Sequence, residues 1–137
     1  MNKKVWIGAG VVFVLFAVLD FVVHGVLLSS EYAKMPDLFR PMEEMKMWIF
    51  FVTYAFVAYF FTLIFSKGYE NKGIAEGVRY GVYVGFMMTV PMAYGTYGSM
   101  PITYALALQW FLYGMLEFII CGVALAIVFK PKAAAAT

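Results

Sequence analysis

The chain has 137 residues, of which 64% are hydrophobic and only 13% are charged, and its mean hydropathy is +0.84. Soluble domains carry about 25% charged residues, so this composition excludes an ordinary water-soluble domain and indicates an integral membrane protein. The net charge of +2 is too small to indicate a nucleic-acid partner. A spanning helix needs about 20 apolar residues, so four spans with short loops would use residues 1–137 as a single all-α domain.

The first predicted helix covers residues 5–28, an apolar run that is broken only by Asp20 and His24. It follows a short basic head, an arrangement that also resembles a secretory signal. The run is long, contains an acidic residue and lacks an A-x-A cleavage site, so we expect it to be retained as a membrane span. Asp20 and His24 are four residues apart, which places their side chains on one face of a helix.

Three further helices are predicted, at residues 41–65, 73–94 and 102–129. Pro41 suits the first turn of the second helix, because a proline there loses no helical hydrogen bond. Pro91 is expected to kink the third helix, since its ring removes an amide donor and clashes with the preceding turn. The fourth helix follows an uncharged turn and leads into a short alanine-rich tail.

The third predicted helix carries a row of glycines at a four-residue step, Gly73, Gly77, Gly81 and Gly85. Residues four apart share one helix face, so this face is nearly bare of side chains. In lipid, a bare face lets the backbone of another helix approach closely, as in a glycine zipper. We therefore predict that this helix is the packing centre of the bundle. Its partner is the first helix, the fourth helix or another protein.

The distribution of basic residues predicts the orientation. The head, the second connection and the tail hold most of the ten lysines and arginines, namely Lys3, Lys4, Lys67, Lys72, Arg79, Lys130 and Lys132. The first and third connections hold only Lys34, Arg40 and Lys46. Because cytoplasmic loops carry the excess of positive charge, both termini are expected in the cytoplasm. The membrane is expected to be the inner (plasma) membrane of a bacterium.

Polar side chains form a second stripe on the fourth predicted helix, where Gln109, Tyr113 and Glu117 recur at a four-residue step. At about 1.5 Å per residue, this stripe matches Asp20 and His24 in depth. Charged groups in a membrane rarely face lipid, so both stripes should face protein or a wet cavity. We expect one polar cluster in the outer half of the bundle, with Asp20 meeting Tyr113 or Glu117 and His24 meeting Gln109. The inner half is expected to be dry.

Two carboxyl groups at close range share a proton, which suits proton transfer or cation binding. The alternative is that the polar groups satisfy one another and fix the helix register. His24 is the only histidine, so a haem b group would need a methionine or a second chain as its other ligand.

A methionine-rich stretch at the start of the second predicted helix offers a metal site. Met42, Met45 and Met47 form the pattern M-x-x-M-x-M, and His24 is a further candidate ligand. Thioethers are soft ligands that bind Cu(I), so copper is one interpretation. The other is that methionine fills irregular gaps in apolar packing.

The chain contains none of the sequence signatures of metalloproteases, serine hydrolases or nucleotide-binding loops, so we expect no enzyme and no obligatory cofactor. The first interpretation is a non-catalytic accessory or scaffold subunit within a larger membrane complex or a homo-oligomer. The second is a small oligomeric proton or metal-ion transporter or channel that uses the polar cluster. The third is a haem-binding electron carrier. In each case the lipid bilayer and other membrane subunits are the expected partners.

Overall fold

The computed structural model describes residues 2–131, of which 82% are helical and none lies in a strand. Met1 and residues 132–137, which include Lys132 of the orientation argument, lie outside the described residues. In chain order the elements are α1 (Lys3–Asp20), the π-helix η1 (Phe21–Leu27), α2 (Ser29–Ala33), the 3-10 turn η2 (Met42–Glu44), α3 (Met47–Lys67), α4 (Ile74–Ser99) and α5 (Tyr104–Phe129).

Two of the predicted helix boundaries are wrong by more than a turn. The second helix begins at Met47 and not at residue 41, because the backbone is extended at Pro41 and Met45 on either side of the 3-10 turn. The third helix continues through Pro91 and beyond residue 94 to Ser99. In this last stretch the hydroxyl groups of Thr96 and Ser99 donate to the carbonyls of Met92 and Gly95 one turn back, so these polar side chains are satisfied within the helix.

Three helical segments are long and apolar enough to cross a membrane: Lys3–Leu27, Met47–Lys67 and Tyr104–Phe129. The all-helical class and the apolar character of the chain are therefore confirmed. α4 has the same length as α5, 26 residues, but is not among the three. Its many glycines and tyrosines make it less apolar than the other long helices. The fourth span and the cytoplasmic termini remain predictions.

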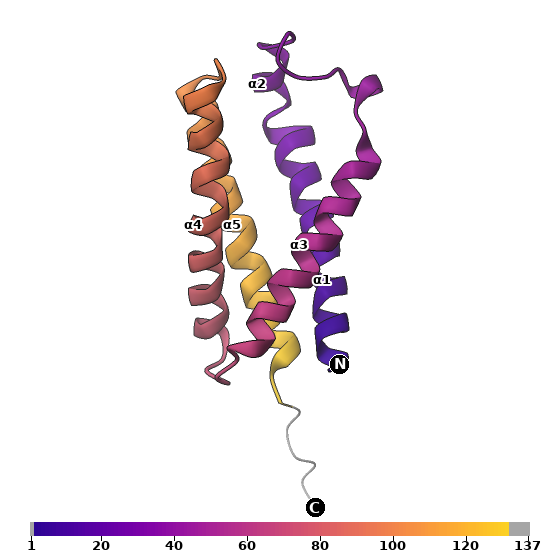
Figure 1. Ribbon diagram of the computed structural model, residues 1–137, viewed down its shortest axis with the longest axis vertical. Coiled ribbons are helices and arrows are strands. Elements are labelled where there is room, and N and C mark those ends of the chain that lie inside the picture. The colour runs from indigo at the N-terminus through magenta and orange to yellow at the C-terminus, as the bar shows by residue number, and fades with distance from the viewer. Residues whose placement is uncertain (1, 132–137) are drawn as a thin grey trace, which may run out of the picture.

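α5 is the centre of the bundle, because it contacts each of α1, α3 and α4. The prediction that the glycine-bearing helix is central is wrong, since α4 packs almost entirely against α5. Figure 1 shows α4 beside α5, and α1 contacts both α3 and α5. We call the end that holds the start of α1, the end of α5 and the 68–73 turn the terminal end, and the opposite end the far end.

The glycine row of α4 forms the closest helix contact in the described chain. A Cβ atom added to Gly77 would collide with the carbonyl of Gly122, and one added to Gly81 would lie 2.5 Å from the carbonyl oxygen of Phe118. At Gly85 the nearest atom is the sulfur of Met115, at 3.0 Å. The partner of the row is therefore α5, one of the three alternatives, and the backbones meet with no side chain between them.

Gly73 does not belong to this contact, although it begins the glycine row. It precedes α4 with a φ of +73°, and a Cβ atom there would meet nothing within 4 Å. Its role is in the 68–73 turn, where Asn71 also has a positive φ. The carboxylate of Glu76 stabilises this turn, because it accepts hydrogen bonds from the amides of Glu70 at 2.6 Å and Lys72 at 2.8 Å. Glu76 is only 4% exposed.

The terminal half of the bundle is closed and the far half is open. The buried cluster of the terminal half joins α1, α3 and α5 through apolar side chains that include Val12, Phe61, Leu125 and Phe129. Toward the far end α3 leans away from α4, and a separate apolar cluster forms where residues 28–39 fold back onto the start of α5. The candidate site lies between these two clusters.

Candidate functional site

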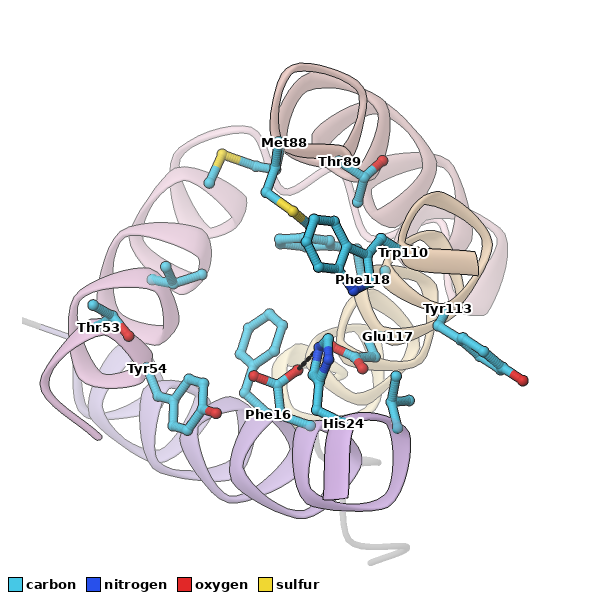
Figure 2. A pocket seen from close by; sticks show the side chains of 15 residues that line it. Phe16, His24, Thr53, Tyr54, Met88, Thr89, Trp110, Tyr113, Glu117 and Phe118 are labelled. Atoms are coloured by element: carbon cyan, nitrogen blue, oxygen red, sulfur yellow. Dashed lines mark ion pairs between the residues drawn. The ribbon is translucent and has the colours of Figure 1, made fainter. Parts of the chain in front are cut away.

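A cavity of about 250 Å³ lies among α1, η1, α3, α4 and α5 (Figure 2). Its polar lining residues are Asp20, His24, Thr53, Tyr54, Thr89 and Glu117, which come from every one of these elements. Aromatic side chains supply much of the remaining wall, including Phe16, Trp110 and Phe118. The cavity therefore combines an apolar, aromatic wall with a few convergent polar groups, as small-molecule sites do.

Asp20 is the centre of the polar groups. It is the last residue of α1, and its Oδ1 lies 3.7 Å from Nε2 of His24, the ion pair that is dashed in Figure 2. The Tyr54 hydroxyl on α3 and the Glu117 carboxyl on α5 lie near it and line the same cavity. Asp20 thus faces groups from η1, α3 and α5, and two of these three neighbours, His24 and Glu117, are ionisable.

The π-helix η1 begins immediately after Asp20. Its wider turn is seen in the bond from the Leu28 amide to the Val23 carbonyl at 2.8 Å, five residues back. Single π turns of this kind are rare and occur mostly at functional positions. Here the π-helix carries His24, so it sets where the imidazole lies relative to the carboxyl of Asp20.

His24 is held on its other side by Tyr32 of α2. The Tyr32 hydroxyl lies 2.5 Å from Nδ1 of His24 and accepts a hydrogen bond from the indole of Trp110 at 2.7 Å. Because the indole is only a donor, the hydroxyl proton is free to go to Nδ1, which assigns the ring proton of a neutral His24 to Nε2, facing Asp20. Burial raises the pKa of Tyr32 to about 12, so this hydroxyl keeps its proton.

Exposure of the three ionisable side chains increases toward the far end. Glu117 is 7% exposed as a residue, whereas the side chains of Asp20 and His24 are 22% and 40% exposed. On the terminal side of Glu117 the helices close over apolar groups, including Phe118 and Cys121. The polar groups therefore become more exposed toward the far end, and apolar side chains cover their terminal side.

The structure brings together three of the five residues that the sequence places in the polar cluster: Asp20, His24 and Glu117. Tyr113 lies at the cavity, but its ring points away from it in Figure 2. Gln109 does not line the cavity, and its amide oxygen is buried without a partner. The expected pairing of His24 with Gln109 is wrong, because the folding of residues 28–39 onto α5 places Tyr32 at the imidazole instead.

Sequence reasoning missed the contribution of Tyr32 and Trp110. Trp110 has the position of an interfacial aromatic residue, and Tyr32 lies in a connection whose path no periodicity fixes. Their contact spans 78 positions in the chain and depends on the fold of residues 28–39. Tyr54 was not missed, because its position in the helix already predicts a depth similar to that of Asp20.

The candidate metal ligands are not gathered in one place. None of Met42, Met45 and Met47 lines the cavity that His24 lines, and Met42 and Met47 are exposed. Residues 2–131 contain no set of three His, Cys, Asp or Glu side chains placed to hold one metal ion. The geometry thus gives no support to the copper interpretation over ordinary methionine packing.

Comparison with protein-family models, with curated proteins and with solved structures found no match for the chain. Two carboxyl groups at close range can share one proton. Asp20 and Glu117 line the same cavity, and an imidazole and a phenol lead from it toward the far end.

Proposed function

We propose that this protein is a bacterial plasma-membrane protein of four spanning helices that binds and exchanges protons at the pair of Asp20 and Glu117. Three segments have the length and apolar character of spans, and α4 supports a fourth because it runs beside α5 at equal length. The terminal end carries most of the basic residues, which supports cytoplasmic termini. The far end then faces the outside.

The observation that carries the proposal is that two carboxyl groups, Asp20 of α1 and Glu117 of α5, line one cavity between the helices. Ionisable groups in membrane spans are expensive to place and mark proton or ion pathways. The increasing exposure from Glu117 to His24 gives the pair access from outside. The closed terminal half favours a binding and exchange site over an open proton channel.

Infrared spectroscopy of the protein in lipid tests this proposal. We expect the carbonyl band of a protonated carboxyl group, which shifts when H2O is replaced by D2O and disappears in Glu117→Gln. The matched control is Glu43→Gln, which removes an exposed carboxyl in the η2 turn and should leave the band unchanged. A band that is absent, or that survives in both Glu117→Gln and Asp20→Asn, contradicts the proposal.

The scaffold interpretation is the second candidate, and the wide apolar surface of α3 favours it. Phe50, Phe51, Phe56 and Phe60 are all exposed on this helix, which packs mainly on α1. Another membrane subunit or a second copy would cover them. Sedimentation of the purified protein in mild detergent tests this candidate, which predicts a defined complex. A stable monomer contradicts the homo-oligomer.

A further inference from the structure

A second cavity, of about 210 Å³, lies beside the first, and both are lined by Val57, Met88 and Phe118. The second cavity lies between α3 and α4, where the two helices diverge. Its only polar side-chain group is the Tyr80 hydroxyl, which already donates to the Phe61 carbonyl at 2.5 Å. This space therefore offers apolar contact and no free hydrogen-bonding group.

The first cavity, in contrast, is lined by acidic side chains. Asp20 and Glu117 line it, and no lysine or arginine does. Phe16, Tyr54 and Trp110 also line it, and aromatic rings attract cations at their faces through their quadrupole. A cation is attracted to such a lining, whereas an anion would be repelled by two carboxyl groups with only His24 to offset them.

We infer that the two cavities together bind a protonated or quaternary amine that carries a single apolar chain. The ammonium group lies against Asp20 and Glu117, and the chain lies between α3 and α4 in contact with Val57 and Met88. This inference rests on the proposed proton-exchanging pair and gives it a ligand: as the cation arrives, the shared proton leaves toward His24 and the far end. The net charge of the site is thereby conserved, because one positive charge leaves as another enters.

The geometry disfavours other occupants. A metal ion would need several oxygen, nitrogen or sulfur ligands, and no set of three acidic, histidine or cysteine side chains among residues 2–131 is placed to supply them. A neutral chain would fill the second cavity but make no use of the two carboxyl groups. An ammonium on a free amphiphile and an ammonium on a membrane lipid share the chemistry that the site recognises.

Binding should weaken as the pH falls, because protonation of both carboxyl groups removes the negative charge that holds the cation. The titratable groups that face Glu117 are Asp20 and His24 from α1 and η1, Tyr54 from α3, and Cys121 from its own helix. α4 contributes only the uncharged Thr89 beside methionines. Protonation of His24 adds a positive charge to the cavity and therefore acts in the same direction.

Calorimetric titration with three probes that share one chain tests the inference. The protein is held in a neutral maltoside detergent, which carries no ammonium group, and titrated with octyltrimethylammonium, octanol and octyl sulfate. We expect saturable binding of the ammonium alone, weakened about tenfold in Glu117→Gln, because the substitution removes one of the two carboxyl groups that hold the cation. Asp20→Asn is a second variant that removes a carboxyl group facing the ammonium. Val57→Phe places a larger side chain where the two cavities meet. Glu43→Gln is the matched control.

The outcomes separate this inference from the proposed function. Equal binding of octanol, or unchanged ammonium affinity in folded Glu117→Gln and Asp20→Asn, overturns the ligand assignment. If the infrared carboxyl band is present and no ammonium binds, the inference alone fails; if both are absent, the proposed function fails as well. Competition by added lysophosphatidylethanolamine, which has one chain, supports the site and identifies a membrane aminolipid as its source of ammonium.

Discussion

The two halves of the bundle are built in opposite ways. In the terminal half, α4 and α5 meet backbone to backbone through Gly77 and Gly122, and apolar side chains close the space among α1, α3 and α5. In the far half, α3 and α4 separate, α1 widens into a π-helix, and the ionisable side chains line a cavity. One sequence thus combines a dry, close-packed end with an open, polar one.

The difference shows how a small membrane protein can hold polar groups without losing its fold. A site needs fixed supporting elements, and here the glycine contact holds α4 on α5 as far as Phe118, the residue next to Glu117. The far half is then free to leave a cavity, because its helices do not have to close on one another. We therefore expect substitutions in the terminal half to affect stability and those in the far half to affect the site.

The largest effect is expected from Gly81→Leu. The added side chain would enter the space of the Phe118 carbonyl and the Ile119 backbone, which cannot move without separating α4 from α5. Overpacking typically costs about 1–3 kcal/mol, and a backbone clash lies at or beyond the upper end. Thermal unfolding in detergent measures the loss. Gly98→Leu, on the same helix with open space around it, is the control and should change little; equal stability of the two variants contradicts the close contact.

Leu125→Ala should have the next largest effect. Leu125 is fully buried in the terminal half, and truncation of a buried leucine costs about 2–5 kcal/mol, depending on how far the cavity collapses. Leu116→Ala is a control on the same helix, since that side chain is 54% exposed. The free energy of unfolding of each variant measures the difference. Similar losses in the two would mean that the terminal half is not the packed half.

Glu76→Ala should cost about 1–3 kcal/mol, because it leaves two amides of the 68–73 turn without their acceptor. Glu70→Gln is the control. Lys72 is the main cause of the lowered pKa of Glu70, but this pair lies in solvent and should add no measurable stability. Any stability that the ion pair of Glu70 and Lys72 contributes is present above the ordinary pKa of a glutamate. It is lost as the pH falls through the lowered pKa of Glu70. Hydrogen exchange of the turn amides reports both variants.

Tyr32→Phe should have the smallest effect on stability, about 1 kcal/mol, because one net hydrogen bond is removed from each of His24 and Trp110. Its effect on the site should be larger, since the phenol leads from the imidazole to the far end. Proton exchange at the carboxyl pair, followed by infrared spectroscopy after a change to D2O, should slow. Tyr83→Phe, which alters an exposed hydroxyl of α4, serves as control. If the rate of proton exchange is unchanged in both variants, Tyr32 does not lie on the path of the proton.

The sequence predicts the features that rest on a helical repeat. The small-residue face at Gly77, Gly81 and Gly85 is buried as expected, and the depth argument correctly brings Asp20 together with Glu117. The depth of a residue and the helix face on which it lies depend on one helix at a time, so the sequence predicts both well.

The features that the sequence did not predict depend on several segments at once. Which helix is central follows from how all four pack, and α5 has no pattern of its own that identifies it. The π-helix has no known residue signature in the stretch from Phe21 to Leu27. The contact of Tyr32 with Trp110 requires the path of residues 28–39, which no helical repeat describes.

The most direct test follows the carboxyl pair in vesicles that hold the protein in a single orientation. The infrared carboxyl band is recorded after a pH jump on one side of the membrane and then on the other, with Glu117→Gln as the blank. The account predicts that the band responds rapidly to the pH at the far end and slowly or not at all to the pH at the terminal end. A faster response from the terminal end, or an equal response from both, would contradict it.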